Sequence, residues 1–371
     1  MKCLNMFGPV TTRTGYGIFV VNLARAFSKS FEVSLTPRSM IQEESLLNDI
    51  DIRQMCERAY EEFNYNAPSL NIWHAHNMQQ FHSKKRIGFP IFEGSEFTEA
   101  EKIHLNNLDC IATTSEWAKS IVLENLPKKF GDSDVFVING GINPDIFNIQ
   151  QPMSISAIDQ FTGTRAINVG KWEVRKGQAD IIKALAEIRP SLTMFGMWDN
   201  PFWPGWRNFC MQYLQDCGWS PVDQNKAVWK VGADTYLVLV GWVQNHVQYA
   251  EILRKMNFGI FPYRSEGWCL PLQECMGCGL PVIATNYSAP TEFLTDECGI
   301  LLREGEMQPI YDQVHFPDGG RGNWFVPKQE ELCEAILGMM EADWSQLGLS
   351  ASRQAHKFTW DASAKKARIY L

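Results

Sequence analysis

The sequence predicts an α/β protein built on two doubly wound, mostly parallel sheets. Short β-rich runs alternate with segments of helical period through most of the 371 residues, and parallel strands with crossover helices produce this alternation. One stretch without periodicity, residues 143–163, separates the alternation into two series. The chain is also long enough to bury two hydrophobic cores rather than one.

The first series predicts six strands, and the second predicts five more. In the first series the strands are residues 2–7, 32–37, 70–75, 86–92, 109–114 and 134–139, with helices that include 17–30 and 115–125. In the second series the strands are 166–170, 192–196, 236–241, 258–262 and 280–285, with helices that include 176–188 and 246–256.

The interruption between the two series predicts the domain boundary. Residues 143–163 gather Pro, Ser, Asn and Gln, as linkers do. We therefore expect a first domain at 1–150 and a second at 160–358. Ligands of such folds bind outside the carboxyl ends of the strands, so the site should use loops from both domains. Residues 197–230 are dense in Trp, Pro and Asn, and composition leaves open whether they cover a ligand or only pack.

Composition favours a cytoplasmic protein that does not bind polyanions through its overall charge. The net charge is -8 and the pI is near 5.5, so nucleic acid or membrane contact would need a local basic patch. The start of the chain indicates a strand rather than a signal sequence, and no run reaches the ~18 apolar residues of a membrane span. Most of the ten Cys lie in apolar runs. Cys275 and Cys278 form a C-x-x-C with no second pair at zinc spacing, so no structural metal is expected.

The most informative motif lies in residues 262–292, where a strand end, a glycine turn and a helix start carry two carboxylates. Glu266 and Glu274 stand eight residues apart. This string resembles the E-x7-E signature of glycosyltransferase family 4, which has the GT-B fold of two Rossmann-like domains facing across a cleft. The resemblance implies that Glu266 meets the transferred sugar and Glu274 the nucleotide ribose. At 1.5 Å per helical residue the two positions would lie roughly a dozen ångströms apart.

The residues between the two glutamates predict an anion site. Gly267 lets the backbone approach a ligand closely, and the amides of Trp268, Cys269 and Leu270 would lie at the start of the helix. Exposed amides and the positive helix end together suit a diphosphate. An amphipathic helix with two solvated glutamates is the structural alternative, and the full string argues against it.

A second motif, Gly170 to Gly177, supplies cations after a strand. Lys171 and Lys176 match the two cations of the family motif G-[RK]-x4-K-G, which hold the donor diphosphate. Fixed cations help most as negative charge develops on a leaving diphosphate. The structural alternative is a basic helix end.

The first half carries further candidates. Gly15 and Gly17 open a helix and match the family's glycine-rich loop at the donor phosphates, although Val20 stands where a dinucleotide fingerprint has its third glycine. His76 matches a histidine near the transferred sugar and can exchange a proton near pH 7. His74 is the weaker candidate, and either histidine can instead be structural.

The remaining matches are smaller. The Val243 backbone corresponds to the place where the family holds the base. The last helix, about residues 359–371, resembles one that crosses back to the first domain. Other positions that match the family pattern, or that we expect behind the donor site, are Glu93, Ser115, Glu116, Ser288 and Glu292. Ser115 and Glu116 are also expected to cap a helix.

The resemblance implies a retaining, metal-independent glycosyltransferase without a bound cofactor. Its donor would be a UDP-, GDP-, ADP- or TDP-sugar, and its acceptor a hydroxyl of a saccharide or glycan. A protein or a modified nucleic-acid base stays open as acceptor, as does a non-catalytic relative that binds sugar nucleotides. The sequence does not decide the oligomeric state.

Other enzyme classes fit less well. A phosphorylase of this fold needs a lysine-bound pyridoxal phosphate and a longer chain, and epimerases lack the full E-x7-E string. Metal-dependent transferases use a D-x-D. Asp49 with Asp51, and Asp132 with Asp134, have that spacing but lie in polar stretches that predict a surface position.

Overall fold

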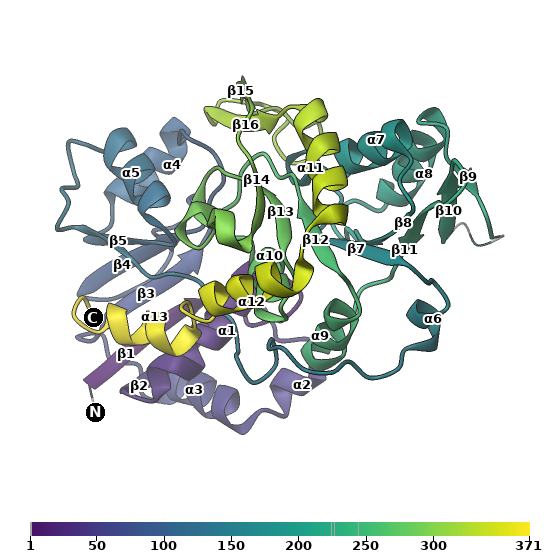
Figure 1. The fold of residues 1–371 in the computed structure, drawn as a ribbon. Helices are drawn as coiled ribbons and strands as arrows, with labels where there is room; N and C mark the ends of the chain where they lie inside the picture. The colour runs from purple at the N-terminus through teal and green to yellow at the C-terminus, as the bar shows by residue number, and fades with distance from the viewer. Residues whose placement is uncertain (1, 224, 226, 244) are drawn as a thin grey trace.

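The computed structural model describes residues 2–223, 225, 227–243 and 245–371, and its frame is two large sheets (Figure 1). The first sheet is parallel throughout, in the order β2-β1-β3-β4-β5-β6. Its strands are β1 Lys2–Gly8, β2 Phe31–Pro37, β3 Pro68–Trp73, β4 Lys85–Pro90, β5 Cys110–Thr113 and β6 Val135–Val137. Its helices are α1 Gly15–Ser28, α2 Glu44–Leu47, α3 Ile50–Glu61, α4 Glu99–Asn106 and α5 Glu116–Asn125.

The second sheet has the order β14-β13-β12-β7-β8-β11-β10-β9 and is antiparallel only at its β11-β10-β9 edge. Its strands are β7 Thr164–Val169, β8 Leu192–Met197, β9 Ser220–Pro221, β10 Val228–Val231, β11 Thr235–Leu239, β12 Phe258–Phe261, β13 Val282–Thr285 and β14 Gly299–Leu302. Its helices are α7 Gln178–Ile188, α8 Trp206–Asp216, α9 His246–Arg254, α10 Leu270–Gly277, α11 Gln329–Glu341 and α12 Trp344–Ala355. A hairpin, β15 Gly305–Pro309 and β16 Asn323–Pro327, extends from this half.

The observed α/β fold confirms the predicted fold class. Each predicted strand coincides with a strand of the structure. Strands β9, β10 and β14 and the β15–β16 hairpin were not predicted from the sequence. These strands are short or lie at edges, where one-sided burial leaves little hydrophobic periodicity to detect.

The tryptophan-rich segment mostly packs. Trp198, Trp206, Trp219 and Trp229 are buried in the hydrophobic core of the second sheet. The Trp198 indole donates to Asn168 Oδ1 at 2.7 Å. Phe202 and Phe209 are exceptions, because they are 62% and 54% exposed. This segment therefore mainly supports the sheet and leaves these two aromatic rings at the surface.

The chain returns to the first sheet at its end. The segment after β6 contains only the short helix α6, Ser156–Asp159, before β7 begins. Helix α13, Trp360–Ala367, lies beside α1 (Figure 1). The Trp360 and Phe19 rings meet edge to face at 5.1 Å, and Tyr370 stacks on Phe136 at 4.2 Å. The last residues thus cover part of the first sheet.

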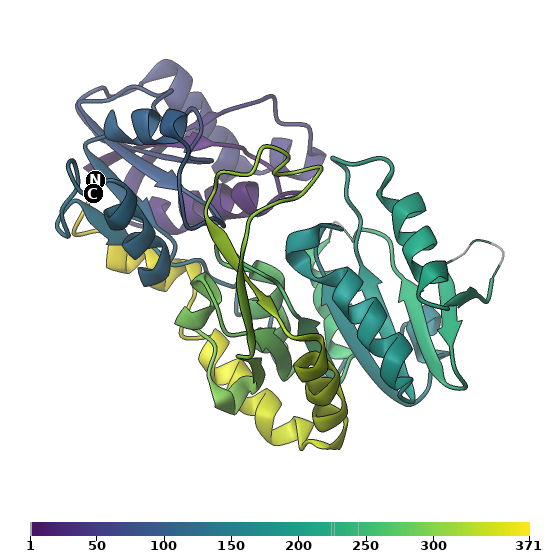
Figure 2. The same cartoon turned by 90° about the horizontal axis from the view of Figure 1, so that it is seen from above.

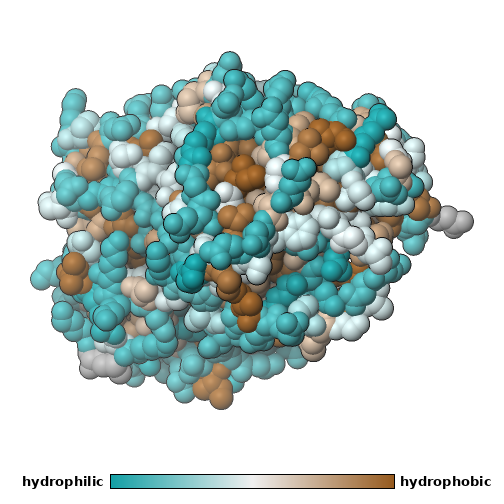
Figure 3. Space-filling view, in the orientation of Figure 1, coloured by the Kyte–Doolittle hydropathy of each residue, from teal (hydrophilic) through white to brown (hydrophobic). Residues whose placement is uncertain are grey.

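The surface fits the composition. Figure 3 shows a largely hydrophilic face on which apolar residues form separate patches.

The two D-x-D pairs form ordinary structural contacts. Asp49 caps α3 and pairs with Arg25 at 2.5 Å, and Asp132 pairs with Lys119 at 2.7 Å. Among the described residues no helix has both the length and the apolar character to cross a bilayer, and no group of three potential metal ligands is found. All ten cysteines are free, and Cys275 and Cys278 are buried.

Candidate active site

Glu266 lies in the loop between β12 and α10 and is 4% exposed. Its amide donates to Ser288 Oγ at 2.8 Å, which places Ser288 directly behind it. Helix α10 begins only at Leu270. The expectation that helical rise separates Glu266 from Glu274 is therefore wrong for the first part of the spacing, because a loop rather than a helix spans it.

Two cations from the other motif hold the Glu266 carboxylate. Arg175 Nη1 lies 2.9 Å from Oε2, and Lys176 Nζ lies 2.5 Å from Oε1. Burial favours the protonated form of Glu266, but both cations outweigh burial and hold its pKa below the ordinary value. Burial disfavours charge on Lys176 as well, yet Glu266 raises the pKa of Lys176. The structure thus brings together Lys176 and Glu266, which the sequence analysis placed in separate motifs.

Arg175 is a residue of the site that the sequence analysis did not select. It is 6% exposed and also contacts Glu173 at 3.0 Å, Glu93 at 3.5 Å and the Ser265 carbonyl at 2.9 Å. A buried guanidinium with three carboxylates and a carbonyl can position several loops at once. The basic pair Arg175-Lys176 was the only available sequence signal, and it does not distinguish the two residues.

Lys171 follows β7 and is more accessible. Its Nζ lies 2.6 Å from Glu173 Oε1 and 5.2 Å from the centre of the Phe202 ring, and its side chain is 38% exposed. Burial opposes ionisation of Glu173, but Arg175 and Lys171 prevail and lower the pKa of Glu173 to about 2. A ligand can therefore reach Lys171 from solvent.

Glu274 lies on α10, buried at 6% exposure, in an environment that disfavours its charge. Burial raises its pKa to about 8, against the lowering effect of the Tyr249 hydroxyl on α9. No salt bridge joins Glu274 to a cation in the described part of the chain. Such a carboxyl group suits neutral hydroxyl partners rather than a phosphate.

At the start of α10 the backbone amides remain ligand candidates, whereas the Trp268 side chain is structural. Cys269 adopts a left-handed conformation (φ +69°) just before α10. The Trp268 ring is buried against Phe293 and donates to Gln273 Oε1 at 2.8 Å, so its side chain packs and only its amide is a ligand candidate. A Cβ on Gly267 would lie 2.7 Å from Ile91 Cγ2. The loop therefore lies directly against the first half of the molecule.

The first half presents the glycine turn and the histidines to this loop. Gly15 and Gly17 lie in the first turn of α1, capped by Thr14. Between them, the Tyr16 hydroxyl lies 2.8 Å from His74 Nδ1 and 3.2 Å from the Ile91 carbonyl. Desolvation and the Lys171 and Arg321 cations lower the pKa of His74 to about 4. His74 is therefore neutral at pH 7.

A cavity of about 310 Å³ lies between the two halves. It collects residues that follow the carboxyl ends of β3, β4 and β7, as the fold predicts. Its lining includes Tyr16, His74, His76, Glu93, Lys171, Glu173 and Arg175, joined by Glu101, His315, Phe316 and Arg321 from outside the motifs. Glu266 adjoins this cavity through its ion pair with Arg175, and Lys176 pairs with Glu266 in turn. The predicted His76 and Lys171 thus line one cavity.

Other predicted residues lie outside this cavity's lining. Val243 is half-buried in a loop after β11 and packs against the first core. Ser115 caps α5, and the Glu116 amide donates to Glu292 Oε1 at 2.7 Å, so Glu292 links the two halves. These positions support the site without lining the cavity.

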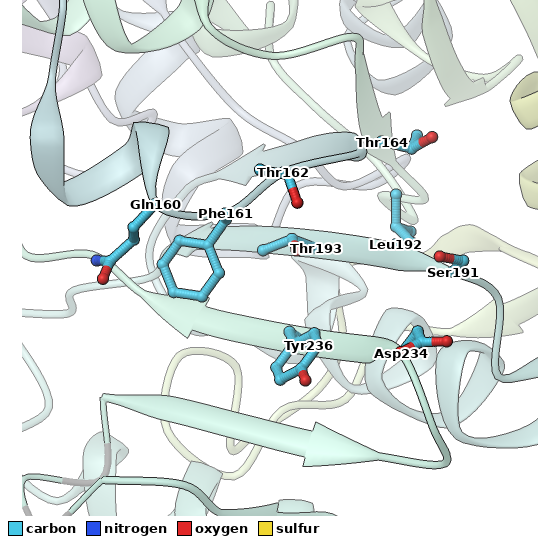
Figure 4. A pocket seen from close by; sticks show the side chains of 9 residues that line it. All are labelled: Gln160, Phe161, Thr162, Thr164, Ser191, Leu192, Thr193, Asp234 and Tyr236. Atoms are coloured by element: carbon cyan, nitrogen blue, oxygen red, sulfur yellow. The ribbon is translucent and has the colours of Figure 1, made fainter.

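Another cavity lies elsewhere in the second half. About 440 Å³ in volume, it is found where β7 and β8 begin, and its lining includes Phe161, Thr193 and Tyr236 (Figure 4). Lys171 follows the opposite end of β7. This cavity contains none of the predicted site residues.

Residues 163–316 match the family model described as Glycosyl transferases group 1. This segment is less than half of the chain, and it is similar to group 1 glycosyltransferases. That segment contains both motifs, so the match confirms the predicted enzyme class, a glycosyltransferase. No curated protein sequence matches the chain significantly.

Solved structures agree with this fold over the whole chain. Sucrose-phosphate synthase from Thermosynechococcus elongatus is 16% identical with a TM-score of 0.69, covering 100% of this chain and 98% of that one. A Rickettsia africae glycosyltransferase is 11% identical, with a TM-score of 0.69 and coverage of 100% and 97%. Anabaena HepE, in complex with UDP and glucose, is 12% identical, with a TM-score of 0.66 and coverage of 100% and 99%. These similarities confirm the GT-B fold.

Proposed function

We propose that this glycosyltransferase moves a sugar from a nucleoside-diphosphate donor to a saccharide hydroxyl and retains the anomeric configuration. The observation that carries the proposal is the buried Glu266 carboxylate held by Lys176 and Arg175 beside the cavity between the sheets. The same proposal includes a first domain at 1–150, a second domain at 160–358 and a cytoplasmic location.

A bound donor would replace some of the ion pairs within this site. Its diphosphate takes Lys176, Lys171 and the amides of Trp268, Cys269 and Leu270, because cations and a helix start favour that charge. Glu266 is then released to accept hydrogen bonds from sugar hydroxyls. Glu274 receives the ribose hydroxyls in its apolar surroundings, and the Val243 backbone holds the base.

The proposed chemistry is a substitution on one face of the sugar. The acceptor oxygen forms the new bond to the anomeric carbon while the bond to the diphosphate oxygen breaks. The acceptor proton passes to that leaving oxygen, and His76 lies on the acceptor side. Lys171, Lys176 and the helix amides stabilise the diphosphate as its charge grows, so the proposal includes no metal or cofactor.

A panel of UDP-, GDP-, ADP- and TDP-sugars tests the donor assignment by thermal shift and by release of sugar and nucleotide. HepE was solved with UDP and glucose, so UDP-sugars are tested first. We expect one nucleotide class to raise the melting temperature and to be turned over. A stabilising nucleotide without any sugar release would instead support a binding protein. Modified nucleic acid is the second acceptor class to test, although the charge of -8 disfavours it.

A further inference from the structure

The loop between β15 and β16, residues 310–322, crosses from the second half of the molecule to the first. We call this segment the strap. Figure 2 shows the tip of the hairpin beside the first half. Three strap side chains, His315, Phe316 and Arg321, line the 310 Å³ cavity. The strap therefore forms part of the wall of the cavity that His74 and His76 also line.

One end of the strap is anchored to the lysine motif. The buried Asp312 carboxylate accepts from the Val174 amide at 3.3 Å and from the His315 amide at 3.0 Å. His315 Nε2 in turn lies 3.6 Å from Glu173 Oε1. Glu173 also pairs with Lys171, so this anchor is continuous with the proposed donor site.

The other end is anchored to the first half. Arg321 Nη1 pairs with the buried Glu101 at 2.6 Å, and the Arg321 carbonyl accepts from the Glu96 amide at 3.1 Å. Gly322 has φ +74°, and a Cβ there would lie 2.1 Å from Ser95 Oγ. Only glycine fits this crossing. The strap thus bridges both halves above the cavity.

The enclosed space is small and chemically mixed. Its volume of about 310 Å³ is at the lower end of ligand pockets, which span roughly 300–1,000 Å³. Phe316 offers an aromatic face and Arg321 a set of donors, and the Arg321 guanidinium lies 5.6 Å from the centre of that ring. A sugar ring presents both C–H groups and hydroxyls. One ring matches this volume and these groups.

We propose that the strap determines acceptor specificity by admitting a single saccharide ring, which packs on Phe316 and receives hydrogen bonds from Arg321 and His315. Longer saccharides and bulk water are excluded while both anchors hold, which favours transfer over hydrolysis. This inference rests on the proposed function, because it assigns the acceptor side of that same site.

The test uses the full chain with whichever donor the panel identifies. Initial rates are measured with methyl hexosides and with linear trisaccharides as acceptors, for the wild type, Phe316→Ala and Arg321→Ala. Phe316→Ala leaves the Arg321–Glu101 pair in place, so it keeps the test valid if Arg321→Ala does not fold. Arg303→Ala is the control, because Arg303 forms an exposed ion pair with Asp296 at 2.7 Å.

We expect the wild type to use hexosides and not trisaccharides. Both strap variants should raise the hexoside KM about tenfold, increase donor hydrolysis and leave the donor KM within about twofold. Any one of three results would overturn the strap assignment and leave donor turnover standing: an unchanged hexoside KM in both variants, wild-type transfer to trisaccharides, or no wild-type transfer to hexosides. Absence of donor turnover in the wild type would overturn the proposed function and the strap assignment together.

Discussion

Lys176 Nζ lies 2.5 Å from Glu266 Oε1 inside the protein, although the two residues are 90 positions apart in the chain. This ion pair joins the lysine motif to the E-x7-E motif. Glu266 is buried and the Lys176 side chain is only 15% exposed, so each charge stabilises the other. The pair therefore links stability and the proposed donor chemistry.

Glu266→Gln should reduce turnover by about 10²-fold or more while changing donor affinity much less, because Glu266 is proposed to act on the reacting sugar. It should also lower the melting temperature, since Arg175 and Lys176 lose their shared carboxylate. Steady-state kinetics and thermal unfolding measure both effects. Glu304→Gln, at an exposed pair with Lys328, is the control. Equal losses of turnover and donor affinity would contradict the role.

Lys176→Ala should cost more turnover than Lys171→Ala, about 10³-fold against about tenfold. The side chain of Lys176 is 15% exposed and that of Lys171 is 38% exposed, and a charge in the drier place interacts more strongly. Turnover at saturating donor measures the difference. Lys183→Ala, on the exposed face of α7, should retain wild-type turnover. Equal losses of turnover in Lys176→Ala and Lys171→Ala would show that burial does not decide which lysine contributes more.

Glu274→Gln should change how stability depends on pH. The folded-state pKa of Glu274 is raised from 4.5 to about 8 by burial, so the folded protein binds more protons than the unfolded chain between these values. Its contribution to the free energy of unfolding therefore falls as pH rises through that window. The glutamine of the variant does not ionise, so the variant does not lose this stability as the pH rises. The melting temperature of the variant minus that of the wild type should therefore increase between about pH 5 and pH 9.

The matched control for this measurement is Glu334→Gln, at an exposed position of α11. Its difference from wild type should stay constant across the same pH series. A constant difference for Glu274→Gln as well would contradict the raised pKa.

Glu274→Ala should weaken donor binding more than it slows turnover, because Glu274 is proposed to receive the ribose hydroxyls. Donor titration and steady-state kinetics measure the two effects.

Gly267→Ala should impair turnover about tenfold or more by displacing the loop that carries Glu266. The new Cβ would lie 2.7 Å from Ile91 Cγ2 and 3.0 Å from the Phe92 carbonyl, both in the first half. Gly338→Ala on α11 is the control, because its Cβ meets only Ile300 Cδ1 at 3.5 Å. That variant should keep activity and gain up to about 1 kcal/mol of helix stability. Wild-type turnover in Gly267→Ala would show that the loop tolerates displacement.

Local patterns in the sequence predicted most of the sheet strands and the positions of the motifs. Hydrophobic periodicity predicted strands such as β1 and β7, and glycine turns placed Lys171 and Glu266 after strand ends. These signals involve residues close together in the chain, so they can be recognised from the sequence without the folded structure. The edge strand β9 and its neighbour β10 were missed because they are short.

The identity of each motif, and hence the glycosyltransferase class, was determined by the sequence alone. The tertiary structure decided which charges meet: Arg175 with Glu266, Lys171 with Glu173, and Arg321 with Glu101 across 220 positions. No local pattern encodes such pairs, because the packing of two sheets selects the partners and burial sets their strength. For the same physical reason, the strap and its contacts with both halves became visible only in the folded chain.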